Sequence, residues 1–291
     1  MSKILGIGIA TLDIINSVNS YPEENSEVRA ISQKTVRGGN VTNSLSVLSQ
    51  LNHQTAWAGT LGSKHDAGII LRDLEKHNIN CRYVKTYADG KVPTSYILLN
   101  KSNGSRSIVH HRDLPELDFQ HFKSIALEDF DWLHFEARNI EQTLLMLQHL
   151  KQHFPHIPCS IEFEKHRAGI ETLYALADVL IFSKAFCLSS VQSEPEAFLK
   201  ALSLRFSDKT LILAWGEHGA YAFSQETGMI DSPAYKPALI IDTLGAGDTF
   251  NAGIIDALLK GCHLQTALDK ASRLAGYKIS VDGFDISDYV R

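Results

Sequence analysis

Short apolar runs alternate with stretches of helical period along most of the chain. The runs predict strands at 4–10, 54–59, 132–136, 158–163, 178–183 and 210–215. Apolar residues that recur every three or four positions predict helices at 40–51, 67–77, 246–260 and 264–280, with others between the earlier strands. Strands that alternate with helices form a largely parallel sheet covered on both faces. We therefore predict an α/β fold with a mostly parallel central sheet, helices on both its faces, and a single domain over 1–291.

Two stretches, about 14–37 and 92–111, break this alternation. The first has apolar and polar residues in a two-residue period after a turn-prone segment, and the second reads as a hairpin around the turn 101–104. Each follows a core strand, on the side where α/β sheets bind ligands. We expect them to form a small antiparallel β-sheet that acts as a lid. The alternative is an extension of the main sheet with no gating role.

Composition narrows the classes of protein. Of 291 residues, 44% are hydrophobic and 21% charged, which is ordinary for a globular protein. The net charge of −5 and the absence of a Lys/Arg run argue against nucleic-acid or anionic-membrane partners. The first apolar run is too short for a signal peptide, and the four cysteines lack zinc spacing. We expect a cytoplasmic protein with buried thiols.

The strongest chemical signal is the segment 241–250, in which a strand ends, a Gly-x-Gly turn follows and an amphipathic helix begins. The backbone N–H groups of Gly245, Ala246 and Gly247 at a helix start can form an anion hole. Such dipoles stabilise the negative charge on a phosphoryl group during its transfer. Asp248 beside them can accept the proton of an attacking hydroxyl. Taken alone, Asp248 could equally be an ordinary helix-capping aspartate.

A second cluster suits a polyol. Asp13 is expected at the end of the first strand, where its carboxylate can accept hydrogen bonds from two hydroxyls. Gly39 and Asn40 precede a helix, and Asn43 lies in its first turn. Amides both donate and accept, as sugar hydroxyls do. Read alone, this is also what a glycine turn with an Asn cap looks like.

These two segments carry a family resemblance. D-T-L-G-A-G-D-T-F-N-A-G at 242–253 and R-G-G-N-V-T-N-S-L-S-V-L at 37–48 resemble the C-terminal and N-terminal motifs of the ribokinase-like, PfkB-type carbohydrate kinases. Four further segments, at 21–29, 103–109, 132–139 and 214–220, resemble the branch that phosphorylates free ketohexoses. The resemblance spans nearly the whole chain.

It implies a ribokinase-like fold and ATP-dependent phosphorylation of a neutral ketose, fructose to fructose 1-phosphate in particular. Asp248 would be the general base and the Gly245–Gly247 turn the anion hole. The sugar-binding positions implied are Asp13, Gly39, Asn40 and Asn43. Members of this branch dimerise through clasped lids, so a homodimer is implied as well.

On the nucleotide side, the resemblance implies that Arg106 contacts the ATP phosphates and that Gly216, Glu217, His218 and Gly219 form the nucleotide-binding loop. Without it, Arg106 reads as a solvent-facing arginine and the loop as a turn. Glu136 and Arg138 are secondary site candidates, which an exposed ion pair would also explain.

One departure concerns the metal. Many members of the family carry an Asn-x-x-Glu motif that organises Mg²⁺, and the corresponding segment here reads Ser183-Lys184-Ala185-Phe186. No metal-binding residue is therefore named. Mg²⁺ is still expected, because ATP brings it, and K⁺ is an additional ion that the resemblance admits.

A substrate phosphate near Asp13 would meet a repulsion of about 4 kcal/mol per charge pair at 4 Å in an effective dielectric of 20. A neutral sugar is therefore favoured, although Arg29, Lys34 and Arg37 are near enough in sequence to offset that repulsion. The alternatives are a PfkB-type kinase for another sugar or a nucleoside, and a non-catalytic sugar or nucleotide sensor.

Overall fold

The computed structural model describes residues 1–62 and 65–290. Within these ranges, nine strands form the central sheet in the order β15-β14-β13-β12-β11-β10-β1-β4-β6, parallel except where β14 joins β13 and β15. Its strands are β1 (Lys3–Ile7), β4 (Gln54–Ala58), β6 (Ile79–Asn80), β10 (Trp132–Glu136), β11 (Cys159–Phe163), β12 (Val179–Phe182), β13 (Thr210–Ala214), β14 (Ala220–Ser224) and β15 (Gly228–Ser232). The predicted fold class, a mostly parallel sheet with helices, is confirmed.

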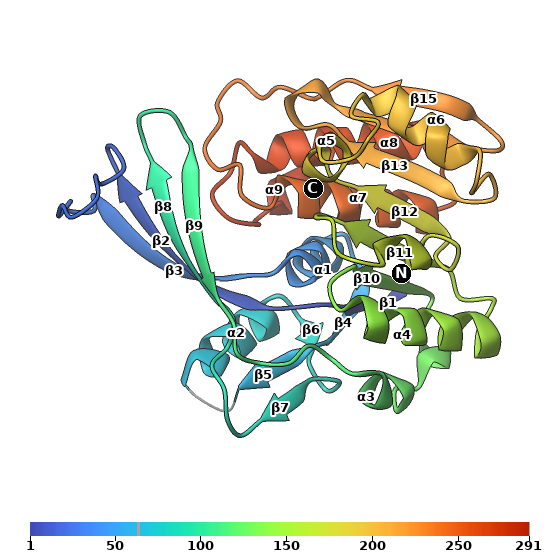
Figure 1. The fold of residues 1–291 in the computed structure, drawn as a ribbon, viewed down its shortest axis with the longest axis horizontal. Coiled ribbons are helices and arrows are strands. Elements are labelled where there is room, and N and C mark those ends of the chain that lie inside the picture. Colours follow the sequence, from blue (N-terminus) through green and yellow to red (C-terminus); the bar gives the residue numbers. More distant parts are fainter. Residues whose placement is uncertain (63–64, 291) are drawn as a thin grey trace.

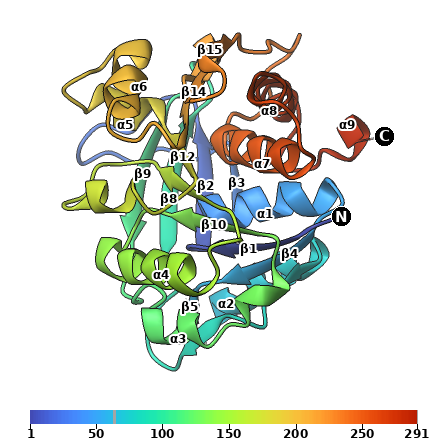
Figure 2. The ribbon, with the colours of Figure 1, turned by 90° about the vertical axis from the view of Figure 1, so that its right-hand side faces the viewer.

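Helices cover both faces of this sheet (Figure 2). One face carries α1 (Asn40–Gln50), α2 (His65–Lys76), α7 (Ala246–Leu259) and α8 (Leu264–Lys278). The other carries α3 (Phe119–Lys123), α4 (Ile140–His153), α5 (Lys184–Leu188) and α6 (Pro195–Ser203). Successive strand residues alternate between the two cores, as the two-residue period of a strand requires: Leu133 packs into one core and Trp132 into the other. The short α9 (Ser287–Val290) ends the chain.

A second sheet projects from one edge of this body (Figure 1). It consists of β3 (Ser32–Gly38), β2 (Thr11–Val18), β8 (Thr94–Asn100) and β9 (Arg106–His111), in that order, and is called the projecting sheet below. It is separate from the central sheet, so the reading as an extension of the main sheet does not hold. The outer pairs are antiparallel as expected, whereas β2 and β8 pair in parallel because both run outward from the core.

The first core strand is shorter than predicted. β1 ends at Ile7, the N–H of Gly8 still bonds the carbonyl of Ala58 at 3.2 Å, and the chain then enters β2. Asp13 therefore lies within a strand of the projecting sheet and not at the end of the first core strand. Most other predicted elements differ by only one to three residues at either end, and the β14–β15 hairpin and the parallel pair β5 (Thr60–Gly62) and β7 (Lys85–Tyr87) were not foreseen.

Among the described residues, no helix combines the length and the apolar character needed to cross a membrane.

Candidate active site

The two glycine motifs meet where α1 packs against α7. The side-chain amide of Asn43 donates from Nδ2 to Oδ2 of Asp248 at 2.7 Å, and the hydroxyl of Ser44 donates to the Asp248 carbonyl at 2.9 Å. Asp248 is 8% exposed. Residues 205 positions apart are thus in direct contact, and the predicted base lies at the junction of the two helices.

The glycine turn leads directly into α7. Gly245 caps the helix with φ +74°, in the left-handed region that favours glycine. A Cβ at this position would also collide with the Phe284 ring, whereas a Cβ at Gly247 would meet nothing within 4 Å. The first helical bond runs from Thr249 N–H to the Gly245 carbonyl at 2.9 Å. The Ala246 N–H makes a long bond of 3.5 Å to the Thr243 carbonyl, and the amides of Gly247 and Asp248 lie at the open N-terminus of the helix, where an anion can bind.

Burial alters the chemistry of Asp248. It raises the pKa of this carboxyl to about 7, the Asn43 hydrogen bond lowers it in part, and the nearby Glu136 and Glu164 carboxylates raise it further. A group with a pKa near neutrality can both hold and release a proton at physiological pH, which is what a general base requires.

Asp13 lies on β2, next to the loop that starts α1. Its Oδ1 accepts a hydrogen bond from the Thr11 hydroxyl at 2.8 Å, and its carboxylate packs against the Cα of Gly38 so closely that a Cβ there would collide with it. Burial raises the pKa of Asp13, and the hydroxyls of Thr11 and Ser95 lower it in part. Gly39 has φ +109°, and a Cβ there would collide with the Ile9 carbonyl, so only glycine fits.

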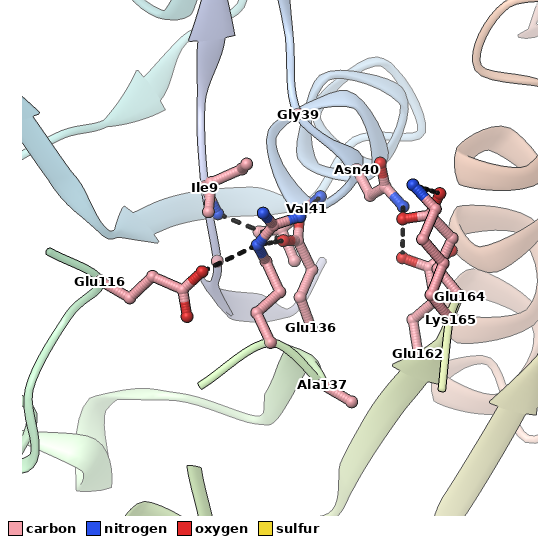
Figure 3. Close-up of polar contacts among 12 residues, drawn as sticks. Ile9, Gly39, Asn40, Val41, Glu116, Glu136, Ala137, Glu162, Glu164 and Lys165 are labelled. Atoms are coloured by element: carbon pink, nitrogen blue, oxygen red, sulfur yellow. Dashed lines mark hydrogen bonds and ion pairs between the residues drawn. The ribbon is translucent and has the colours of Figure 1, made fainter. Parts of the chain in front are cut away.

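Carboxylates line the carboxyl ends of β10 and β11 beside Asn40 (Figure 3). The amide of Asn40 donates to Glu162 Oε2 at 3.0 Å and to Glu164 Oε2 at 3.5 Å. On β10, Glu136 accepts from the N–H of Val41 at 2.7 Å, and burial raises its pKa to about 7. Burial also raises the pKa of Glu162, and the neighbouring carboxylates add to this effect. This end of the sheet therefore holds several acidic groups whose ionised forms are disfavoured by burial and by one another.

Sequence reasoning passed over Glu162 and Glu164. The signal was present, because the buried strand Cys-Ser-Ile-Glu-Phe-Glu places two carboxylates at its carboxyl end, where ligands bind. Glu136 was only a secondary candidate. Its partner candidate Arg138 contacts Glu116 at 3.0 Å and Glu136 at 3.9 Å, and its side chain is 22% exposed, so an exposed ion pair does not describe it.

Arg37 and Lys34 both bond other side chains of the protein. The Arg37 guanidinium is buried and donates to Oδ1 of Asn43 at 2.8 Å, while its Nε contacts Asp73 at 2.5 Å. Lys34 pairs with Asp282. Two of the three positive charges that could offset a substrate phosphate therefore have partners, and the third, Arg29, is exposed in the segment between β2 and β3.

The predicted nucleotide loop follows β13. Gly216 and Gly219 have φ +64° and +100°, which explains the two glycines. Glu217 accepts a hydrogen bond from Lys184 at 2.7 Å, and Lys184 also lies 5.6 Å from the centre of the Trp215 ring. Lys184 was noted only as a departure from the metal motif. It brings a cation to the loop, and the exposed His218 contacts Glu217 at 3.2 Å.

Arg106 is not brought to this loop. It is exposed at the start of β9, opposite Leu99 in the register. β9 belongs to the projecting sheet and lies apart from β13 (Figure 1).

Comparisons with known proteins identify the family and the fold of the chain. The model for the pfkB family carbohydrate kinases matches residues 1–288. Among curated proteins, ketohexokinase of Mus musculus is 36% identical and covers 97% of this chain and 98% of the relative. Among solved structures, ribokinase from Cryptococcus neoformans var. grubii serotype A in complex with ADP has a TM-score of 0.82 at 18% identity and covers 100% and 99% of the two chains. Ribokinase of Arabidopsis thaliana with ribose and ATP has a TM-score of 0.80 at 19% identity, covering 97% and 94%.

The chain belongs to the pfkB family of carbohydrate kinases, and it is an ATP-dependent sugar kinase. Within that family its resemblance is to ketohexokinase, as the four additional segments predict.

Proposed function

We propose that this kinase transfers the γ-phosphoryl group of ATP to a neutral ketose, converting fructose to fructose 1-phosphate. The single observation that carries the chemical part is the 2.7 Å hydrogen bond between Asn43 and Asp248. It joins the segment suited to a polyol to the base at the mouth of the anion hole. The ketose is supported by the similarity to ketohexokinase along 97% of the chain.

The proposed reaction uses the two motifs in turn. Asp13, Gly39, Asn40 and Asn43 hold the sugar hydroxyls, and Asp248 accepts the proton of the hydroxyl that reacts. The sugar oxygen forms a bond to the γ-phosphorus. The bond between that phosphorus and the oxygen that bridges the β- and γ-phosphates breaks, and ADP leaves. The amides at the Gly245–Gly247 turn stabilise the charge on the transferred group.

The charges around the site favour a sugar without a phosphate. Asp13, Glu136, Glu162, Glu164 and Asp248 all lie in this region. A substrate phosphate placed 4 Å from any one of these groups in its ionised form would meet a repulsion of about 4 kcal/mol in an effective dielectric of 20. The buried Arg37 guanidinium bonds Asn43 and Asp73, and Lys34 pairs with Asp282, so neither side chain is free to bind a substrate phosphate.

ATP would bind with Mg²⁺ bridging its phosphates. Among residues 1–62 and 65–290, no three His, Cys, Asp or Glu side chains are grouped so as to hold a metal ion themselves. The excess carboxylates beside Asn40 suit a cation that arrives with the nucleotide. Three further points remain predictions: a requirement for K⁺, the binding of ATP at residues 216–219 and at Arg106, and a cytoplasmic location.

A coupled assay of ADP release tests the substrate. Fructose, other ketoses, aldoses, fructose phosphates and adenosine are compared at equal concentration. We expect the highest kcat/KM with fructose and none above background with fructose phosphates. A preference for adenosine or an aldose would contradict the proposal and support the nucleoside or other-sugar alternative, and nuclear magnetic resonance of the product identifies the hydroxyl that is phosphorylated.

A further inference from the structure

The ammonium group of Lys278 is completely buried directly beneath the anion-hole turn. Its side chain has 0% exposure. Nζ donates to the backbone carbonyl of Asp242 at 2.8 Å and to Oδ2 of the same residue at 2.8 Å. Asp242 is the first residue of the D-T-L-G-A-G-D motif. A buried lysine is costly unless it is paired, so this arrangement requires a reason.

Asp242 is the centre of a set of bonds that defines the shape of the turn. Its Oδ1 accepts the N–H of Leu244 at 2.9 Å, which bends the chain toward Gly245. Its Oδ2 accepts the N–H of Gly283 at 3.2 Å in addition to Lys278. The carboxylate thus joins the motif to the C-terminal segment, and the buried ammonium is its charged hydrogen-bond partner.

The C-terminal segment also supports the turn from below. The Phe284 ring lies against Gly245, where a Cβ would collide with it, and its centre is 5.4 Å from Lys278 Nζ. The Phe284 carbonyl accepts a hydrogen bond from Gln50 of α1 at 2.7 Å. Lys278, Phe284 and Gln50 therefore link the turn to α8 and to α1, the two helices that flank α7.

We propose that Lys278 is a positioning residue for the anion hole: its ammonium fixes Asp242, and through Asp242 the amides of the Gly245–Gly247 turn, in the orientation that phosphoryl transfer needs. This inference rests on the proposed role of that turn. A fixed dipole stabilises a transition state only if it is held in place before the reaction, and misplacement by about 1 Å can lower the rate on the order of 100-fold. The sugar-binding residues Asp13 and Asn40 make no bond to Lys278 or Asp242, so sugar affinity should be independent of it.

The test compares Lys278→Met with Lys270→Met, which is the same change at an exposed position of α8. With fructose and ATP, we expect Lys278→Met to lower kcat on the order of 100-fold with little change in the sugar KM. Lys270→Met should match the wild type. Near-normal kcat in Lys278→Met, or an effect confined to the sugar KM, overturns the proposal.

Lys278→Met leaves the Asp242 carboxylate without its cation and will unfold more easily. The double variant Asp242→Asn with Lys278→Met removes both charges and keeps an oxygen that can accept the Leu244 N–H. We expect its melting temperature to recover while kcat stays low. If kcat recovers together with the melting temperature, Lys278 has only a structural role. If the wild type itself does not use fructose, the proposed substrate fails, and the same comparison is made with the sugar identified in the screen.

Discussion

The guanidinium of Arg37 donates to Oδ1 of Asn43 at 2.8 Å, and this bond fixes which end of the Asn43 amide faces Asp248. Because Oδ1 is turned to Arg37, Nδ2 is the atom that reaches the Asp248 carboxylate. Arg37 also bonds the hydroxyls of Thr42 and Ser46 on α1 at 2.9 and 2.7 Å. The buried Arg37 cation thus orients the Asn43 amide, and this amide holds the Asp248 carboxylate.

Asn43→Asp tests this chain of contacts. The new carboxylate still accepts from Arg37, but it places a second negative charge against Asp248 and should raise the pKa of Asp248 further. We expect kcat at pH 7 to fall about tenfold or more and to recover in part at higher pH. The rate–pH profile measures the shift, and Asn19→Asp at an exposed position is the control. An unchanged profile would show that Asn43 does not set the state of the base.

Asp248→Asn should nearly abolish turnover, by about 10²–10⁴-fold, because the amide cannot accept the proton of the sugar hydroxyl. Sugar binding, measured by calorimetry, should stay close to that of the wild type. The variant should also melt at a higher temperature at pH 8, since the raised pKa means that the ionised Asp248 is less favourable in the folded than in the unfolded state. Near-normal kcat would remove Asp248 from the role of base.

The activity of the wild type should rise with pH through about 7. Burial raises the pKa of Asp248 to about 7, and only the ionised carboxylate can accept a proton. Below this value kcat/KM should fall about tenfold per pH unit. For folding the sign is reversed: the stability contributed by the raised pKa is fully present below about 3.8 and is lost as the pH rises through about 7. If kcat/KM does not change between pH 5.5 and pH 8.5, the assignment of Asp248 as the base is contradicted.

Arg106→Ala should raise the KM for ATP more than the KM for the sugar. Arg106 lies on the projecting sheet and is exposed, so its removal should not lower the melting temperature. Initial rates with each substrate varied in turn provide the measurement. Arg29→Ala, at an exposed position between β2 and β3 of the same sheet, is the matched control. If only the sugar KM changes, Arg106 does not bind the phosphates.

We expect a homodimer through the projecting sheets. All six residues of the edge strand β9 are exposed, including Ile108 at 51% and Val109 at 70%, and unpaired strand edges readily bind a second copy. Light scattering at micromolar protein should give twice the mass of the chain. Val109→Glu should shift the mass toward the monomer, whereas Val191→Glu, at a position 99% exposed outside this sheet, should not. A monomeric wild type contradicts this expectation.

The sequence predicts well wherever local pattern decides structure. β10 has the predicted bounds of 132–136, because a buried run between turn signals is read directly from hydrophobicity. The strand expected at 4–10 was too long, since the chain leaves the core at Gly8 without any change in polarity. The parallel pairing of β2 with β8 could not be read, because it joins segments that lie about 80 residues apart.

The site shows the same division. The glycine motifs locate Asp248 and Gly39, because the sequence around each residue determines its place at the start of a helix. Lys278 acts through Asp242, which lies 36 residues away in the sequence, and no local pattern predicts this contact. Arg37 bonds Asn43 only six residues away, but the bond depends on the burial of its guanidinium in the folded protein. The contacts of Arg37 and Lys278 could therefore be identified only from the structure.

Asp13 belongs to the same strand as the outer part of the projecting sheet, and this has a consequence for regiochemistry. β2 is continuous from Thr11 at the core to Val18. Any rotation of the sheet relative to the core therefore moves the Asp13 carboxylate relative to Asp248, which is held on α7. With Asp13 holding the sugar and Asp248 acting as the base, as proposed, the angle between the two sheets would decide which hydroxyl faces Asp248. Substitutions far from the sugar, at the root of the sheet, could redirect phosphorylation from one carbon to another without altering any residue that touches the substrate.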